Sequence, residues 1–273
     1  MAETPTVPTT AVPTTLSVYT YIGASSTASD QHHAAGQLRL RNDLRHGGGL
    51  LAAPLGIMVL DCAASNTQHL ALSAPTRIDV HVLERATDVS TLRIEGTISR
   101  HGRTQLCTEA RITDADDPQR LVAYATTTFV ATGPPATSAQ YTHTAPADDG
   151  PLTGWPPLVG AFGGTPTGGG AWSIPALDAA AGRRRLHSGV MQTVAEQAVL
   201  DLVSERSGRH PLRTDLLSTT VMTEGRVGPF AVLPELLAVD ARSATAKVEV
   251  RDTGAEDRFV ALLTVRLRLS DAG

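Results

Sequence analysis

The sequence is poor in aromatic residues and in cysteine. Its 273 residues include four Phe, four Tyr and two Trp, only 4% of the chain, so nucleic-acid binding through rows of stacking rings is not expected. The formal net charge of −4 also argues against a polyanionic partner. Cys62 and Cys107 are too few for a disulfide framework or a metal site, and two buried thiols are favoured over a bridge between them. Neither a metal nor a cofactor is indicated.

Long apolar runs are missing as well. The longest covers residues 50–60, whereas a helix needs about 18 apolar residues to span a bilayer. Residues 1–15 lack the basic flank and apolar stretch of a signal peptide. Hydrophobic residues still make up 41% and charged residues 18%, which is typical of a folded chain. We therefore expect a cytoplasmic protein without a membrane span.

Composition divides the chain into four segments. Residues 1–15 are rich in Thr and Pro, which predicts a disordered arm. Residues 133–167 combine Pro, Gly and small polar residues, as a linker does, with a short edge strand expected just before Gly168. The segments 16–132 and 168–273 are then two ordered domains, each long enough for one compact unit.

The two domains repeat one order of elements. Each has a short strand-like segment (36–41 and 171–177), a His followed by Gly, a long helix-compatible stretch (50–65 and 190–204) and then strands. The expected strands are 76–84, 92–100, 105–113 and 121–132 in the first domain, and 214–222, 230–239, 244–251 and 258–269 in the second. A long helix followed by an antiparallel meander indicates an α+β fold.

The second helix opens with a motif that carries a resemblance. His187 is followed by Ser188 and Gly189, and Glu196 stands nine residues after the His. This pattern resembles the signature of hotdog-fold acyl-CoA thioesterases of the phenylacetate-pathway type, in which His-Gly-Gly opens a helix and an Asp or Glu follows nine residues after the His. Here Ser188 replaces the first Gly.

The resemblance implies a double hotdog, in which each of two fused units has a long central helix wrapped by an antiparallel β-sheet. It further implies hydrolysis of an acyl-CoA or acyl-carrier-protein thioester at a site between the two units. Relatives often pair, so a homo-oligomer of such chains stays open.

The spacing agrees with this chemistry. A helix start offers unpaired N–H groups and a partial positive charge for a developing oxyanion, and Gly47 and Gly48, after His46, would let a carbonyl approach the backbone. Glu196 lies about 13 Å along its own helix, so the resemblance implies that it serves the helix start of the other unit. There it would act as general base on water or as nucleophile.

Further residues are assigned to the sites through the resemblance. Thr214, 18 residues after Glu196, matches a hydroxyl that often assists in relatives. Asn42 is the nearest match to an assisting amide, although its offset differs by two residues. His46 and His187 are expected to orient their loops rather than to react.

The second site departs from the pattern. It would combine the 187–189 helix start with a carboxylate of the first domain, but Leu55 stands nine residues after His46. Asp61, the only charge in that helix, lies six residues further, about 9 Å and 240° of rotation away. It reaches the site only if the helix begins late, with Pro54 in its first turn. Otherwise Asp61 is a buried structural acid, so we expect one competent site and one degenerate site.

Other interpretations stay open. Helical periodicity places Glu196 opposite an apolar stripe, as a solvated residue would be. The three arginines at 183–185 are favoured as a solvated basic patch over a contact with coenzyme A phosphates. A double hotdog that binds an acyl thioester without cleaving it is an alternative function. An enoyl-CoA hydratase or dehydratase is another, although no hydratase signature is found.

Overall fold

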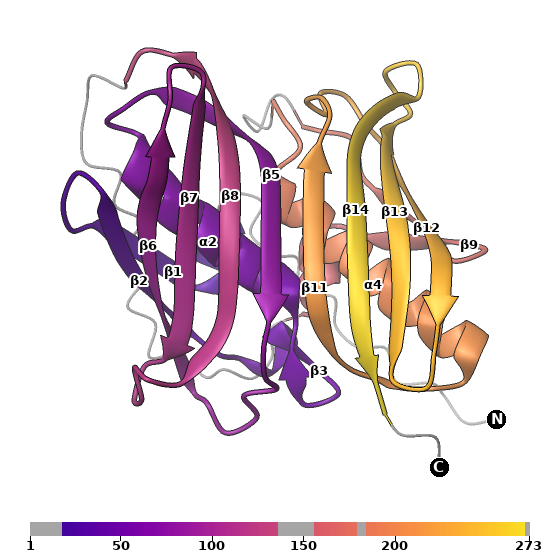
Figure 1. Ribbon diagram of the computed structural model, residues 1–273. Coiled ribbons are helices and arrows are strands. Elements are labelled where there is room, and N and C mark those ends of the chain that lie inside the picture. The colour runs from indigo at the N-terminus through magenta and orange to yellow at the C-terminus, as the bar shows by residue number, and fades with distance from the viewer. Residues whose placement is uncertain (1–17, 136–155, 179–183, 271–273) are drawn as a thin grey trace.

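The computed structural model describes residues 18–135, 156–178 and 184–270 (Figure 1). Twelve strands form one antiparallel sheet, and two long helices, α2 (Ala52–Thr67) and α4 (Ser188–Ser207), pack against it. We call residues 18–135 the first half and residues 156–270 the second half. The first-half strands of the sheet are β1 (Ala24–Ala28), β2 (His33–Arg39), β5 (Leu72–Val82), β6 (Thr91–His101), β7 (Gln105–Asp114) and β8 (Leu121–Gly133). The second-half strands are β9 (Thr165–Gly168), β10 (Ala171–Ile174), β11 (Pro211–Val221), β12 (Phe230–Val239), β13 (Ser243–Asp252) and β14 (Arg258–Leu269).

The strand order repeats from the centre of the sheet outward. It runs β1-β2-β6-β7-β8-β5 through the first half and β11-β14-β13-β12-β10-β9 through the second. In each half the strand that follows the helix is therefore innermost, and β5 pairs with β11 across the join. The two strands also share an irregularity, a β-bulge after Pro75 in β5 and after Thr214 in β11. These two residues thus occupy equivalent positions.

Alternating side chains explain how the sheet forms a core. In β13 the side chains of Ala246, Val248 and Val250 are fully buried, while the residues between them are partly exposed. Strands of this pattern bury one face and leave the other toward solvent. In Figure 1 both long helices lie on one face of the sheet, where α2 contacts first-half strands and α4 contacts second-half strands.

The two helices meet at equivalent positions. Gly56 and Gln192 are each the fifth residue of their helix, and a Cβ on Gly56 would press against the Gln192 amide. Gln192 is buried and its Nε2 donates to Thr219 Oγ1 at 3.0 Å. Because of this crossing, the start of each helix lies beside the middle of the other.

The short elements fall around the helix starts. They are α1 (Val18–Ile22), the 3₁₀ turn η1 (Asn42–Leu44), the hairpin strands β3 (Arg45–His46) and β4 (Gly49–Leu50), and α3 (Leu158–Ala161). The sequence predicts a helix from residue 50, but it begins at Ala52 because residues 45–50 form the hairpin. β1 and α1 were not predicted at all.

The predicted segments differ in how much the structure describes. Residues 1–15 and most of the expected linker lie outside the described residues. β9 lies at the sheet edge just before residue 169, where an edge strand was expected. Within the described ranges, no helix is both long and apolar enough to cross a membrane.

Candidate active site between the halves

Glu196 of α4 reaches the start of α2 in the other half. Its Oε1 accepts a hydrogen bond from the backbone N–H of Ala52 at 2.7 Å, and its Oε2 accepts one from Ala53 at 2.9 Å. These are the first two residues of α2, so the carboxylate satisfies N–H groups that a helix start leaves unpaired. The side chain is only 1% exposed, and the interpretation of Glu196 as a solvated residue is therefore wrong.

Burial and hydrogen bonding act on this carboxylate in opposite directions. Burial raises the pKa of Glu196 and is the largest influence, while Thr214 and the two α2 amides lower it. Thr214 is fully buried, yet its Oγ1 has no hydrogen-bond partner of regular geometry among the described residues. The hydroxyl nevertheless lies close enough to the Glu196 carboxylate to favour its ionised form.

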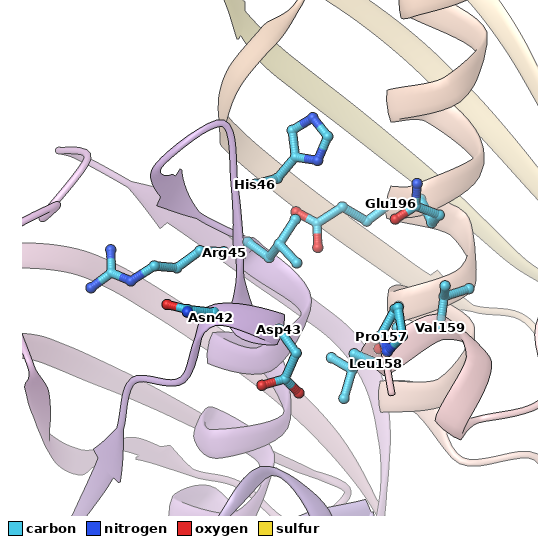
Figure 2. Close-up of a pocket in the computed structure, with 11 residues that line it drawn as sticks. Asn42, Asp43, Arg45, His46, Pro157, Leu158, Val159 and Glu196 are labelled. Atoms are coloured by element: carbon cyan, nitrogen blue, oxygen red, sulfur yellow. The ribbon is translucent and has the colours of Figure 1, made fainter. Parts of the chain in front are cut away.

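A cavity of about 400 Å³ opens beside Glu196. Figure 2 shows Glu196 extending from α4 toward the first-half segment that carries Asn42, Arg45 and His46. The structure thus brings together three residues that the sequence assigns to one site, Glu196, Asn42 and His46. Burial lowers the pKa of His46, partly offset by nearby Asp201, so this ring is neutral near neutral pH.

Several residues of this cavity were missed. Asp43 is held by a buried ion pair with Arg41 at 2.9 Å, and the Arg45 guanidinium donates to the carbonyls of Ala86 and Val89 at 2.9 and 2.6 Å. A buried charge needs such partners. Arg41 lies only two residues before Asp43, whereas the carbonyls that accept from Arg45 are 41 and 44 residues away and leave no local signal. The remaining lining residues are Leu51, Pro157, Leu158, Val159, Thr193 and Gln197.

The glycines of the first motif do not open the helix, contrary to the prediction. Gly47 and Gly48 form the turn between β3 and β4, with φ of +56° and +78°. A Cβ on Gly47 would lie 2.6 Å from the carbonyl oxygen of Pro211. Glycine is needed there for a left-handed turn packed against β11, and the N–H groups at the helix start belong to Ala52 and Ala53.

The motif at the start of α4 is built differently. The His187 Nδ1 accepts from the Gly189 N–H at 3.0 Å and so caps the helix. Burial lowers the pKa of His187 to about 4. The Gly189 backbone packs against Ile57 of α2 so closely that a Cβ would overlap that side chain. His187, Ser188 and Gly189 therefore shape a helix start and a helix contact.

Asp61 does not stand at the position equivalent to Glu196, so the start of α2 at Ala52 is not late enough to give Asp61 the usual place of the carboxylate. It is fully buried and accepts a hydrogen bond from the Ser26 hydroxyl of β1. Glu196 is the ninth residue of α4, whereas Asp61 is the tenth of α2, and one residue turns a side chain by about 100°. Leu60 stands in the position equivalent to Glu196, and a general base is therefore missing from that position of α2.

Among residues 18–135, 156–178 and 184–270, no three His, Cys, Asp or Glu side chains gather closely enough to hold an ion.

Comparisons with known proteins support the fold. No family model matches the sequence, and no curated protein does either. A conserved hot dog-fold protein of unknown function from Alicyclobacillus acidocaldarius superposes with a TM-score of 0.64 at 13% identity, covering 94% of this chain and 100% of that one. The acyl-CoA thioesterase II TesB2 from Mycobacterium marinum gives 0.61 at 8% identity, with 94% and 99% covered. An acyl-ACP thioesterase from Bacteroides thetaiotaomicron gives 0.55 at 12% identity, with 86% and 97% covered.

These similarities establish the fold. The chain has the hotdog fold, and this prediction from the sequence is confirmed. Its structural neighbours include thioesterases, which it matches over nearly their whole length at low identity.

Proposed function

We propose that this protein hydrolyses an acyl-CoA or acyl-carrier-protein thioester at the Glu196 cavity, between fused hotdog units formed by residues 16–132 and 168–273. The observation that carries the proposal is the buried Glu196 carboxylate, which one half supplies to the helix start of the other at the wall of a cavity. Titratable groups with shifted pKa values in clefts are typical of active sites. Structural neighbours that act on acyl-CoA and acyl-ACP support the substrate class.

In this proposal Glu196 is the general base. Its carboxylate takes a proton from water, and the resulting hydroxide attacks the thioester carbonyl to give a tetrahedral oxyanion. The C–S bond then breaks, and the proton held by Glu196 passes to the departing thiolate. In the nucleophilic variant the carboxylate attacks the thioester carbonyl and expels the thiolate to give a mixed anhydride, which water then hydrolyses to release the acid and restore Glu196.

The α2 amides have a different role from the one the sequence suggested. Since Ala52 and Ala53 already donate to Glu196, they orient the base and are not free for an oxyanion. Asn42 is exposed at the cavity edge, and its side chain makes no hydrogen bond among the described residues. We assign the Asn42 amide to the thioester carbonyl and the Thr214 hydroxyl to the attacking water.

The test is release of free thiol from a panel of acyl-CoA substrates. Glu196→Gln keeps the size and one hydrogen-bond acceptor of the side chain but removes the base, so kcat/KM is expected to fall by about 10²–10⁴-fold. Glu205→Gln is the matched control, because Glu205 is exposed on the last turn of the same helix. Full activity of Glu196→Gln in a folded protein would refute the site.

A second candidate function is binding without cleavage. One observation favours it, namely that Glu196 itself occupies both N–H groups at the α2 start. Saturable binding of a long-chain acyl-CoA by the wild type, with no thiol released over hours, would establish this function in place of hydrolysis.

A further inference from the structure

A second cavity, of about 550 Å³, lies against the start of α4. Ser188, the first residue of that helix, lines it, as does Pro75 of β5. Pro75 is the equivalent of Thr214, since both stand at the matching β-bulges of the two innermost strands. This cavity beside Pro75 therefore corresponds to the region around Thr214 in the other half.

The reactive groups of the first site have no counterparts here. Leu60 stands at the ninth position of α2, where α4 carries Glu196, and Pro75 replaces the Thr214 hydroxyl. Neither side chain can accept a proton or hold a water. A molecule bound in this cavity would meet no general base from the equivalent positions.

The second cavity combines apolar and polar walls and is partly open to solvent. Its apolar wall includes Val130 of β8, Met191 of α4, Met222 and Val260, and the hydroxyl-bearing residues Thr76, Thr132, Ser188 and Thr223 are among its polar lining. Met222 is 52% exposed and Val130 is 36% exposed. Exposed apolar side chains that gather at a cavity mark a binding surface for an apolar group.

The rim carries an excess of positive charge. Arg185, Arg226 and Arg258 line the cavity, and Glu224 is the only carboxylate that does so. Glu224 accepts from Arg185 at 2.9 Å and from Arg226 at 2.7 Å, while the Arg258 side chain has no ion pair among the described residues. The carboxylate of Asp252 lies behind the rim and accepts from the backbone N–H groups of residues 226–228.

We propose that this second cavity binds an amphiphilic anion, an acyl chain with a carboxylate or phosphate headgroup, and holds it without hydrolysis. The apolar walls take the chain, and the arginine rim pairs with the headgroup. Three guanidinium groups and one carboxylate line the cavity, and the Asp252 carboxylate beside it interacts electrostatically with Arg258. Positive charge is still in excess there, in a molecule with a net charge of −4. Because strands of both halves line the cavity, an occupant contacts both and raises the melting temperature.

Calorimetric titration of the full chain carrying Glu196→Gln tests this proposal, since that background removes turnover at the first site. Dodecanoate, a dodecyl-CoA thioether and coenzyme A alone separate the two sources of negative charge, and dodecanol is the uncharged chain. Saturable binding of dodecanoate or the thioether, with dodecanol at least about tenfold weaker, is expected. Equal affinity for dodecanol would overturn the role of the rim.

Variants locate the binding site. Arg226→Gln with Arg258→Gln removes two rim charges, and Met222→Glu places a carboxylate at an exposed position of the mouth; each is expected to weaken binding at least about tenfold. Arg266→Gln is the matched control, because Arg266 is exposed on the same strand as Arg258 but outside the cavity. Unchanged affinity in both cavity variants would refute the proposal, whatever the outcome of the hydrolysis assay.

Discussion

The burial of Glu196 has a thermodynamic consequence at the scale of a single residue. Its pKa is raised by burial, so ionisation costs more free energy in the folded state than in the unfolded chain. The free energy of unfolding therefore falls as pH rises from about 4.5 through the raised pKa. Glu196→Gln is predicted to match the wild type near pH 4 and to become more stable than the wild type as the pH rises toward 8.

Urea unfolding at several pH values measures this difference, with Glu205→Gln as the reference for an exposed carboxylate. A difference in stability between Glu196→Gln and the wild type that stays the same at every pH would contradict the raised pKa of Glu196. A residue retained at a cost in stability, together with loss of thiol release in the same variant, is typical of a functional group.

His187 shows the opposite dependence on pH. Its pKa falls to about 4 in the folded protein from the ordinary value of 6.5, so stability is lost as pH drops from 6.5 toward 4. His187→Asn keeps an oxygen that can accept from Gly189 N–H but does not titrate. Between pH 7 and pH 4 the wild type is predicted to lose on the order of 2 kcal/mol more than this variant. Urea midpoints across that range check the prediction, with exposed His69→Asn as control; parallel curves for wild type and His187→Asn would contradict it.

At the scale of elements, the β3–β4 hairpin explains why the first motif was misread. The His-Gly-Gly pattern at 46–48 matches a helix start, yet a two-residue turn at Gly47 and Gly48 delays the helix to Ala52. Local sequence does not distinguish a glycine that opens a helix from one that turns a hairpin, since both need the same backbone freedom. The deciding contact, with Pro211, lies in the other half.

The packing of α4 on α2 gives a prediction for Gly189. Ala is normally favoured over Gly within a helix, but a methyl group here would overlap Ile57. Gly189→Ala is therefore predicted to cost about 1–3 kcal/mol of the free energy of unfolding. Gly160→Ala in α3 is the control, because a Cβ there has no neighbour within 4 Å. Chemical denaturation compares the two, and equal stability of both variants would show that the helices can move apart.

At the scale of the whole molecule, the sequence predicts an order of elements in each half but not how the two halves join. The repeated order of elements was readable because alternation and helix length are local properties. The pairing across the join, by contrast, depends on the two innermost strands, β5 and β11. The burial of Glu196 depends on α2, whose residue Ala52 lies 144 positions away in the sequence. Periodicity along α4 alone could not reveal that its polar face is covered by α2.

The same contacts predict that the halves unfold together. The β5–β11 pairing, the α2–α4 crossing and the Glu196 hydrogen bonds all cross between halves, and shared contacts of this kind make unfolding cooperative.

Cys62 reports on the first half, since burial raises the pKa of its thiol to about 12 and withholds it from reagents. In a Cys107→Ser background it is the only thiol, while Trp172, 8% exposed in β10, contributes fluorescence from the second half. Thiol labelling and fluorescence are predicted to give one coincident urea transition. Separated midpoints would contradict this prediction and show that one half stays folded after the other has unfolded. The Glu196 site, which needs residues of both halves, would then be lost before the molecule is fully unfolded.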